Sequence, residues 1–119
     1  MIVVVLGASA DPEKYSNKAV RFLLEKGHRV LPVHPKGGEI EGLKVYRSLA
    51  EITEPVDTLT LYVSAPISSS LQSEILALKP RRVIFNPGAE NPVLSEGLPV
   101  WGIQPVEACT LVLLRTEQF

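Results

Sequence analysis

The sequence has little cysteine, no excess of either charge and no long apolar run. One cysteine, Cys109, among 119 residues excludes an internal disulfide and a metal site made of several cysteines. The balance of 12 basic and 13 acidic residues leaves no basic surface for a nucleic acid backbone or an anionic membrane. Apolar runs stay far below the roughly 20 residues of a membrane span, and no basic leader precedes the first one. We therefore expect a soluble, cytoplasmic protein without nucleic acid or membrane partners.

Short apolar segments alternate with helical patterns along the chain. Residues 2–6 ("IVVVL") form a run of mostly β-branched residues, typical of a strand buried on both faces. Residues 17–26 have helical spacing of apolar residues, with Ser16 as the expected N-cap and Gly27 just past the end. A second helix is marked by Ile67, Leu71, Ile75 and Leu78. Further strands are expected within 29–35, 57–64, 81–85 and 99–103, and a short crossover within 43–52.

This order of strands and helices predicts right-handed βαβ units and a parallel sheet of about five strands. The expected fold is a Rossmann-like, three-layer α/β/α arrangement, and residues 1–119 are expected to form a single domain. The tail "CTLVLLRTEQF" fits either a helix or an edge strand.

Four prolines follow the expected strands: Pro35, Pro66, Pro87 and Pro105. One interpretation is that each of these prolines only ends a strand. Loops with fixed φ at the carboxyl edge of a parallel sheet are, however, what a preformed ligand pocket would use.

The turn "GASADPEKYSNK" after the first strand resembles a phosphate-binding turn but has a single glycine, Gly7. The dinucleotide motif G-x-G-x-x-G is tighter than this loop. The N–H groups around Ala8 and Ser9, the Ser9 hydroxyl and the helix start at Asn17 and Lys18 are candidates to hold a diphosphate. The alternative is a purely structural turn.

The second expected strand ends in Val33-His34-Pro35-Lys36. An NAD site usually has an acidic residue here that binds the ribose hydroxyls. A lysine instead favours a ligand with a phosphate on that sugar, which NADP and coenzyme A both carry, although a lysine on a solvated loop is often only a surface charge.

Four segments together, "VVVLGAS", "SNKAVRFLLEKGHRVLPVHPKGGEIEGLKVYRSLAEI", "VIFNPGAEN" and "EACTLVLL", resemble the small stand-alone CoA-binding domain proteins. These are similar to the nucleotide-binding domain of the succinyl-CoA synthetase α subunit. The resemblance covers nearly the whole chain, and its specificity lies in the ordered combination of G-A-S, H-P-K and N-P-G-A-E.

Carried over by position, the resemblance implies four groups of contacts with coenzyme A or an acyl-CoA. The diphosphate would be surrounded by Gly7, Ala8, Ser9, Ser16, Asn17 and Lys18. The 3′-phosphate would face His34, Pro35 and Lys36. The adenine or the start of the pantetheine arm would lie beside Ser64, Ala65 and Pro66. The far side of the cleft would be lined by Asn86, Pro87, Gly88 and Glu90.

Two departures from the family pattern stand out. Only "PVLSEG" separates "NPGAEN" from "LPVWG", so we expect the far edge of the sheet to be trimmed. The phosphorylated histidine that ligase relatives use, which belongs to a second domain, is missing here.

Catalytic groups are sparse. His34 has no nearby nucleophile or carboxylate in sequence, and Glu90 and Glu107 are isolated carboxylates. Cys109 reads as a small buried hydrophobe, or alternatively as a thiol that forms a mixed disulfide with coenzyme A. The sequence therefore favours non-catalytic binding of coenzyme A or an acyl-CoA. One alternative is an NADP-binding or ligase-type subunit whose catalytic part is on another chain, and another is a regulatory protein with a sensor or vestigial CoA pocket.

Overall fold

A computed structural model describes all residues, 1–119, and its centre is one parallel sheet. The sheet consists of β1 (Ile2–Leu6), β2 (Arg29–Val33), β5 (Thr58–Leu61), β6 (Arg82–Phe85) and β7 (Gln104–Glu107). The strands lie in the order β2-β1-β5-β6-β7, and every pair is parallel. After β2 the chain crosses back over β1 to form β5 on its other side, so the order of the strands reverses between β1 and β5. The residues between β2 and β5 include a separate two-stranded hairpin, β3 (Glu39–Ile40) and β4 (Leu43–Lys44).

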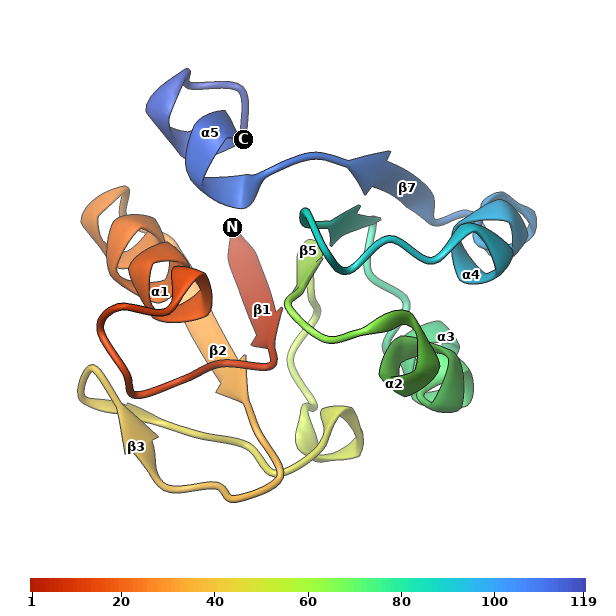
Figure 1. Ribbon diagram of the computed structural model, residues 1–119. Coiled ribbons are helices and arrows are strands. Elements are labelled where there is room, and N and C mark those ends of the chain that lie inside the picture. The colour runs from red at the N-terminus through yellow and green to blue at the C-terminus, as the bar shows by residue number, and fades with distance from the viewer.

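Helices cover both faces of the sheet (Figure 1). They are α1 (Tyr15–Glu25), α2 (Ala65–Ser70), α3 (Gln72–Leu78), α4 (Pro92–Gly97) and α5 (Thr110–Arg115), with 3₁₀ helices η1 (Leu49–Glu51) and η2 (Pro99–Trp101). In Figure 1, α1 and α5 lie on one side of the sheet and α2, α3 and α4 on the other. The expected three-layer, Rossmann-like α/β arrangement is confirmed. None of these helices combines the length and apolar character needed to cross a bilayer.

The core divides between the two faces because side chains alternate along a strand. Val3 and Val5 of β1 pack with Leu23 of α1 and Leu114 of α5. Val4 and Leu6 point the other way, into a larger cluster that contains Ile75 of α3 and Leu98. This explains why the segment "IVVVL" is apolar at every position rather than at every second one.

The strand ends are aligned at the carboxyl edge. Leu6 pairs with both Val33 and Leu61, and Leu61 pairs with Phe85. The loops that follow β1, β2, β5 and β6 therefore leave the sheet at one edge. In open α/β sheets the crevice at this edge, where the strand order reverses, is the usual place for a ligand.

The last strand differs from expectation. Residues 99–101 form η2, whereas β7 begins at Gln104. Pro105 therefore lies inside an edge strand and does not follow one. The amides of Gln104 and Ala108 donate inward, to the carbonyl oxygens of Arg81 and Phe85, so the nitrogen of Pro105 faces outward, where no ladder hydrogen bond is lost. The sheet has the five strands that were expected, and the segment "PVLSEG" at its far edge forms only the short helix α4.

Three helical expectations also change in detail. Helix α1 begins at Tyr15 with Lys14 as N-cap, so Ser16 is a buried residue of the first turn and not the cap. The apolar spacing from Ile67 to Leu78 belongs to two short helices, α2 and α3, which meet at Leu71. The tail, for which helix and strand were both open, forms α5.

Candidate functional site

Two cavities lie at the carboxyl ends of β1, β2 and β5, and His34 lines both. The larger, of about 570 Å³, extends from the end of β1 across to α2 and α3. The smaller, of about 260 Å³, lies between the β1–α1 loop and the segment after β2. Of the expected site residues, the larger cavity is lined by Gly7, His34, Pro35 and Ser64. The smaller one is lined by Ala8, Ser9, His34 and Lys36.

Gly7 makes the turn after β1 possible. Its φ is +88°, and a Cβ at this position would lie 2.7 Å from the carbonyl oxygen of Tyr62. Its N–H donates to the carbonyl oxygen of Val33 at 3.0 Å, and the N–H of Ala8 donates to the same oxygen at 3.2 Å. These two amides are therefore used within the protein, which corrects the expectation that the N–H of Ala8 is available to a diphosphate.

Ser9 and Asn17 connect the β1–α1 loop to α1. The Asn17 side chain is fully buried; its Nδ2 donates to the carbonyl oxygen of Ser9 at 2.8 Å, and its Oδ1 accepts from Nε of Arg21 at 2.8 Å. The Ser9 hydroxyl oxygen accepts from the N–H of Asp11 at 3.1 Å, which leaves the hydroxyl proton free to donate. Asn17 thus supports the loop, and Ser9 offers the donor.

Lys18 and Ser16 do not line either cavity. The ammonium of Lys18 lies 5.3 Å from the centre of the Tyr15 ring, and Ser16 is buried.

The segment after β2 contains two side chains that can donate hydrogen bonds to a ligand, those of His34 and Lys36. The N–H of His34 donates to the carbonyl oxygen of Tyr46 at 2.9 Å, and the N–H of Lys36 donates to Nδ1 of His34 at 3.1 Å. A ring nitrogen that accepts carries no proton, so the neutral imidazole has its proton on Nε2. Lys36 is exposed and forms no ion pair. Nε2–H of His34 and the Lys36 ammonium are both suited to bind a phosphate.

Asn86 belongs to a buried polar network. Its Nδ2 donates to Oγ1 of Thr60 at 2.6 Å and to the carbonyl oxygen of Leu61 at 2.8 Å. Its Oδ1 accepts from the N–H of Thr110 at 2.8 Å. Asn86 therefore fixes the start of α5 against β5, and both N–H groups of its side-chain amide are used within the protein.

The other expected residues on this side also lie outside both cavities. The Glu90 carboxylate accepts from the N–H of Gly88 at 2.9 Å, which closes a local turn. The remaining ones are Ala65, Pro66 and Pro87.

Tyr62 and Cys109 are the candidate reactive groups near the sheet edge. The Tyr62 hydroxyl is buried without a hydrogen-bond partner. Burial raises the pKa of Tyr62 to about 12, although the nearby hydroxyls of Thr110 and Thr60 act in the opposite direction. Cys109 is a free thiol, and it is half-buried, whereas one of the two interpretations of the sequence was a small buried hydrophobe. No group of three His, Cys, Asp or Glu residues could hold a metal ion.

Several lining residues of the larger cavity were not anticipated from the sequence. Arg47 and Ser48 follow the β3–β4 hairpin, and Glu74 comes from α3. Arg47 lies within the segment "KVYRSL" that carried the family resemblance, which was the available signal. Glu74 had none, because its position depends on the packing of η1 against α3.

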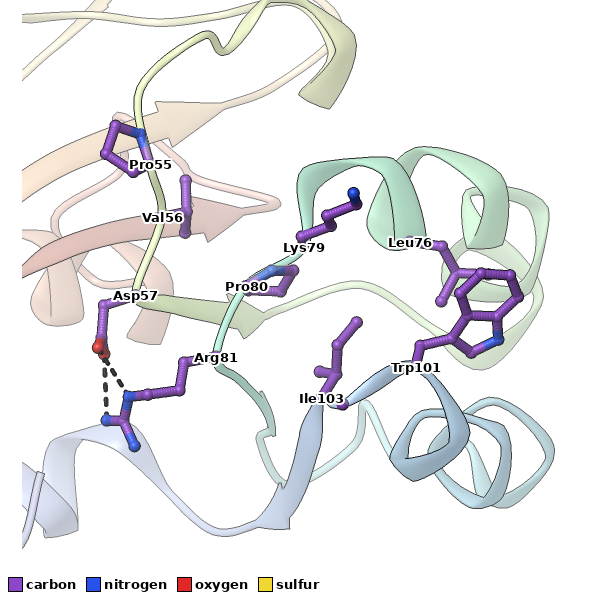
Figure 2. Close-up of a pocket in the computed structure, with 10 residues that line it drawn as sticks. Pro55, Val56, Asp57, Leu76, Lys79, Pro80, Arg81, Trp101 and Ile103 are labelled. Atoms are coloured by element: carbon purple, nitrogen blue, oxygen red, sulfur yellow. Dashed lines mark hydrogen bonds and ion pairs between the residues drawn. The ribbon is translucent and has the colours of Figure 1, made fainter.

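A further cavity of about 450 Å³ opens at the opposite, amino end of the sheet. Figure 2 shows the Trp101 indole beside Leu76 and Arg81 paired with Asp57. Nε of Arg81 donates to Oδ2 of Asp57 at 2.9 Å. Gly102 lines this cavity with a φ of +77°, but unlike Gly7 it has nothing within 4 Å of its Cβ position, and ligands of open α/β sheets bind at the carboxyl edge. The candidate site is therefore the pair of cavities around His34.

A parallel sheet with helices on both faces, and a cavity where the strand order reverses, defines the chain as a Rossmann-like α/β protein. Within that class, the chain belongs to the family of the CoA binding domain, whose family model matches residues 2–115.

Relatives and solved structures agree with this assignment. The α subunit of the ADP-forming acetate–CoA ligase I of Pyrococcus furiosus is 42% identical over 69 residues, a match that covers 53% of this chain and 15% of that subunit. The crystal structure of an uncharacterised protein is 42% identical, with a TM-score of 0.94 and coverage of 99% of this chain and 97% of that one. A Thermus thermophilus protein, cell-free ID.343, is 34% identical, with a TM-score of 0.90 and coverage of 99% and 90%. The chain therefore spans only a small part of the ligase subunit but nearly all of the two small proteins.

Proposed function

We propose that this protein binds coenzyme A or an acyl-CoA at the carboxyl edge of its sheet and catalyses no reaction alone. The observation that carries the proposal is the larger cavity, about 570 Å³ at the point where the strand order reverses, joined through His34 to the smaller one. The larger cavity has room for a nucleoside. The smaller one offers Ser9, His34 and Lys36 to phosphates.

The charges around the site favour coenzyme A over NAD. The residues directly after β2 are His34, Pro35 and Lys36, with no carboxylate to bind ribose hydroxyls; Glu39 of β3 also lines the smaller cavity, and Arg47 lines the larger one. A ligand with a phosphate on its ribose suits these groups. Coenzyme A and NADP both have such a phosphate, and the family assignment favours coenzyme A.

The site lacks a catalytic arrangement. The Nδ1 of His34 is occupied by the N–H of Lys36, so no carboxylate orients this ring. The carboxylate of Glu90 is directed at the N–H of Gly88, outside both cavities. These contacts support binding without bond making or breaking by this chain.

Native mass spectrometry of freshly purified protein, followed by calorimetry with four ligands, tests the proposal. We expect coenzyme A to bind more tightly than dephospho-coenzyme A, NADPH and NADH. Tighter binding of NADPH than of coenzyme A, or steady oxidation of NADPH with carbonyl substrates, would contradict it.

A second candidate is the CoA-holding subunit of a ligase whose catalytic residues are on another chain. The identity with the acetate–CoA ligase α subunit favours it. Co-purification with a second chain that confers ATP-dependent acyl-CoA formation would support this role, and binding of coenzyme A without such a chain would favour the simple binding module.

A further inference from the structure

The cavity of about 450 Å³ at the amino end of the sheet is built by the three segments that lead into β5, β6 and β7. Its lining consists of Leu76 of α3 and residues 55–57, 79–81 and 101–103. Backbone hydrogen bonds join these segments: the N–H of Arg81 donates to the carbonyl oxygen of Asp57 at 2.9 Å, and the N–H of Gln104 donates to that of Arg81 at 3.0 Å. The cavity is therefore preformed, and its volume lies in the range of about 300 to 1,000 Å³ that small ligands occupy.

Trp101 gives this cavity an aromatic wall that is open to solvent. The residue is 63% exposed, although it is the largest apolar side chain of the protein. Figure 2 shows its indole beside Leu76, with Ile103 lying in this view between the indole and Pro80. Ile103 and Pro80 are buried and form the apolar base of the cavity. Aromatic rings gain from packing on one another as well as from losing contact with water, so this wall suits a flat apolar ring.

The charges that line the cavity leave one cation without a partner. Asp57 is the only carboxylate in the lining, and it pairs with Arg81 through Nε at 2.9 Å and Nη2 at 3.4 Å. Lys79 is exposed at the end of α3 and forms no ion pair. The lining therefore has one net positive charge, carried by Lys79, and favours an anion over a cation.

We propose that this cavity is a second ligand site, separate from the one around His34, and that it binds a small aromatic carboxylic acid. The ring packs against Trp101 and the apolar base, and the carboxylate pairs with Lys79. Both side chains line the cavity and are exposed, so a ligand inside it meets them directly. A second copy of this chain, docked through the same face, fits less well, because the lining has no unpaired carboxylate to meet the Lys79 of the other copy.

Nuclear magnetic resonance of the whole protein tests this site. Trp101 is the only tryptophan, so its indole N–H gives a single signal that reports on the cavity. The probes are benzoate, 3-phenylpropanoate and 1-naphthylacetate, each compared with its neutral amide. We expect at least one acid to shift the signal below about 10 mM and to bind about five- to tenfold more tightly than its amide.

The variants are Lys79→Gln and, as a matched control, Lys26→Gln at the exposed end of α1. Lys79→Gln should bind the acid and its amide within about twofold of each other, whereas Lys26→Gln keeps the wild-type preference. The comparison of two probes on one protein cancels a general loss of stability.

Three results would overturn the proposal: no shift with any of the acids, the same preference in Lys79→Gln as in the wild type, or tighter binding of the amides. A dimer in sedimentation velocity that Trp101→Glu dissociates would also overturn it, because the face would then belong to a second copy. None of these measurements uses coenzyme A, so their outcome is independent of the proposed function.

Discussion

The backbone of Gly7 passes so close to Tyr62 that a Cβ on Gly7 would lie 2.7 Å from the Tyr62 carbonyl oxygen. This contact joins the turn after β1 to the residue that follows β5. The two strands flank the point where the strand order reverses, and both Gly7 and Tyr62 line the larger cavity of the candidate site. A glycine is required here for two separate reasons, the close approach and the φ of +88°.

Replacement of Gly7 by alanine should lower the free energy of unfolding by about 3 kcal/mol or more, because backbone strain and the clash add. Gly27→Ala is the matched control. Gly27 has a similar φ of +84° but nothing within 4 Å of its Cβ position, so only about 1 kcal/mol should be lost. Urea unfolding of both variants measures the difference. Equal losses would show that the contact with Tyr62 is unimportant.

Lys36→Ala should weaken coenzyme A binding by about five- to tenfold and leave dephospho-coenzyme A nearly unchanged. We expect a small effect because Lys36 is exposed, so the proposed contact with the 3′-phosphate would be solvated. Calorimetry on the four combinations isolates the coupling between the lysine and that phosphate. Lys26→Ala, at the exposed end of α1, should change neither affinity. Equal losses for both ligands would remove Lys36 from the phosphate site.

Asn86→Ala should destabilise the protein by about 2 to 4 kcal/mol, because Thr60, Leu61 and Thr110 would each lose a buried hydrogen bond. We expect hydrogen exchange to rise first in α5, which Asn86 holds. Gln104→Ala, an exposed position in β7, should stay within about 0.5 kcal/mol of the wild type. A loss for Asn86→Ala as small as this control would contradict the structural role of the network.

Stability should fall in alkaline solution because of Tyr62. Burial raises the pKa of Tyr62 to about 12 from its ordinary value of about 10, so the folded state keeps its proton while the unfolded state loses it. Stability is therefore unaffected below about pH 10 and declines by about 2 to 3 kcal/mol as the pH rises toward 12.

The variant Tyr62→Phe checks this assignment. It should lack this part of the alkaline decline, and near neutral pH it should be as stable as the wild type or about 1 kcal/mol more stable, since the lost hydroxyl had no partner. Urea unfolding of both proteins at about pH 9 and pH 12 gives the comparison. Parallel declines in the two proteins would assign the effect to other groups.

Local patterns in the sequence were sufficient for the layered fold and for the turn at the centre of the site. The apolar run of β1 and the helical spacing of α1 are properties of adjacent residues. A strand buried on both faces is apolar at every position, which makes it recognisable in the sequence. Gly7 and the segment from His34 to Lys36 could be predicted as parts of the candidate site because they directly follow such strands.

Other features depended on contacts between distant segments. The segment "PVWGI" looks like a strand by composition, but its first three residues form η2, and β7 instead contains Pro105, which only an outward-facing edge position tolerates. The family resemblance implied that Asn17 and Asn86 contact the ligand; only the structure shows that their side-chain amides also bind Ser9, Thr60 and other groups of the protein.

Some residues that line the site also depend on contacts between distant segments. Arg47 and Glu74 come together in one cavity only because η1 packs beside α3, and no periodicity records that contact. The sequence by itself determined which segments become strands and helices and which turn begins the site, because those depend on neighbouring residues. Only the tertiary structure decided which polar side chains are used within the protein and which remain free for a ligand, because that depends on the partners that folding brings to them.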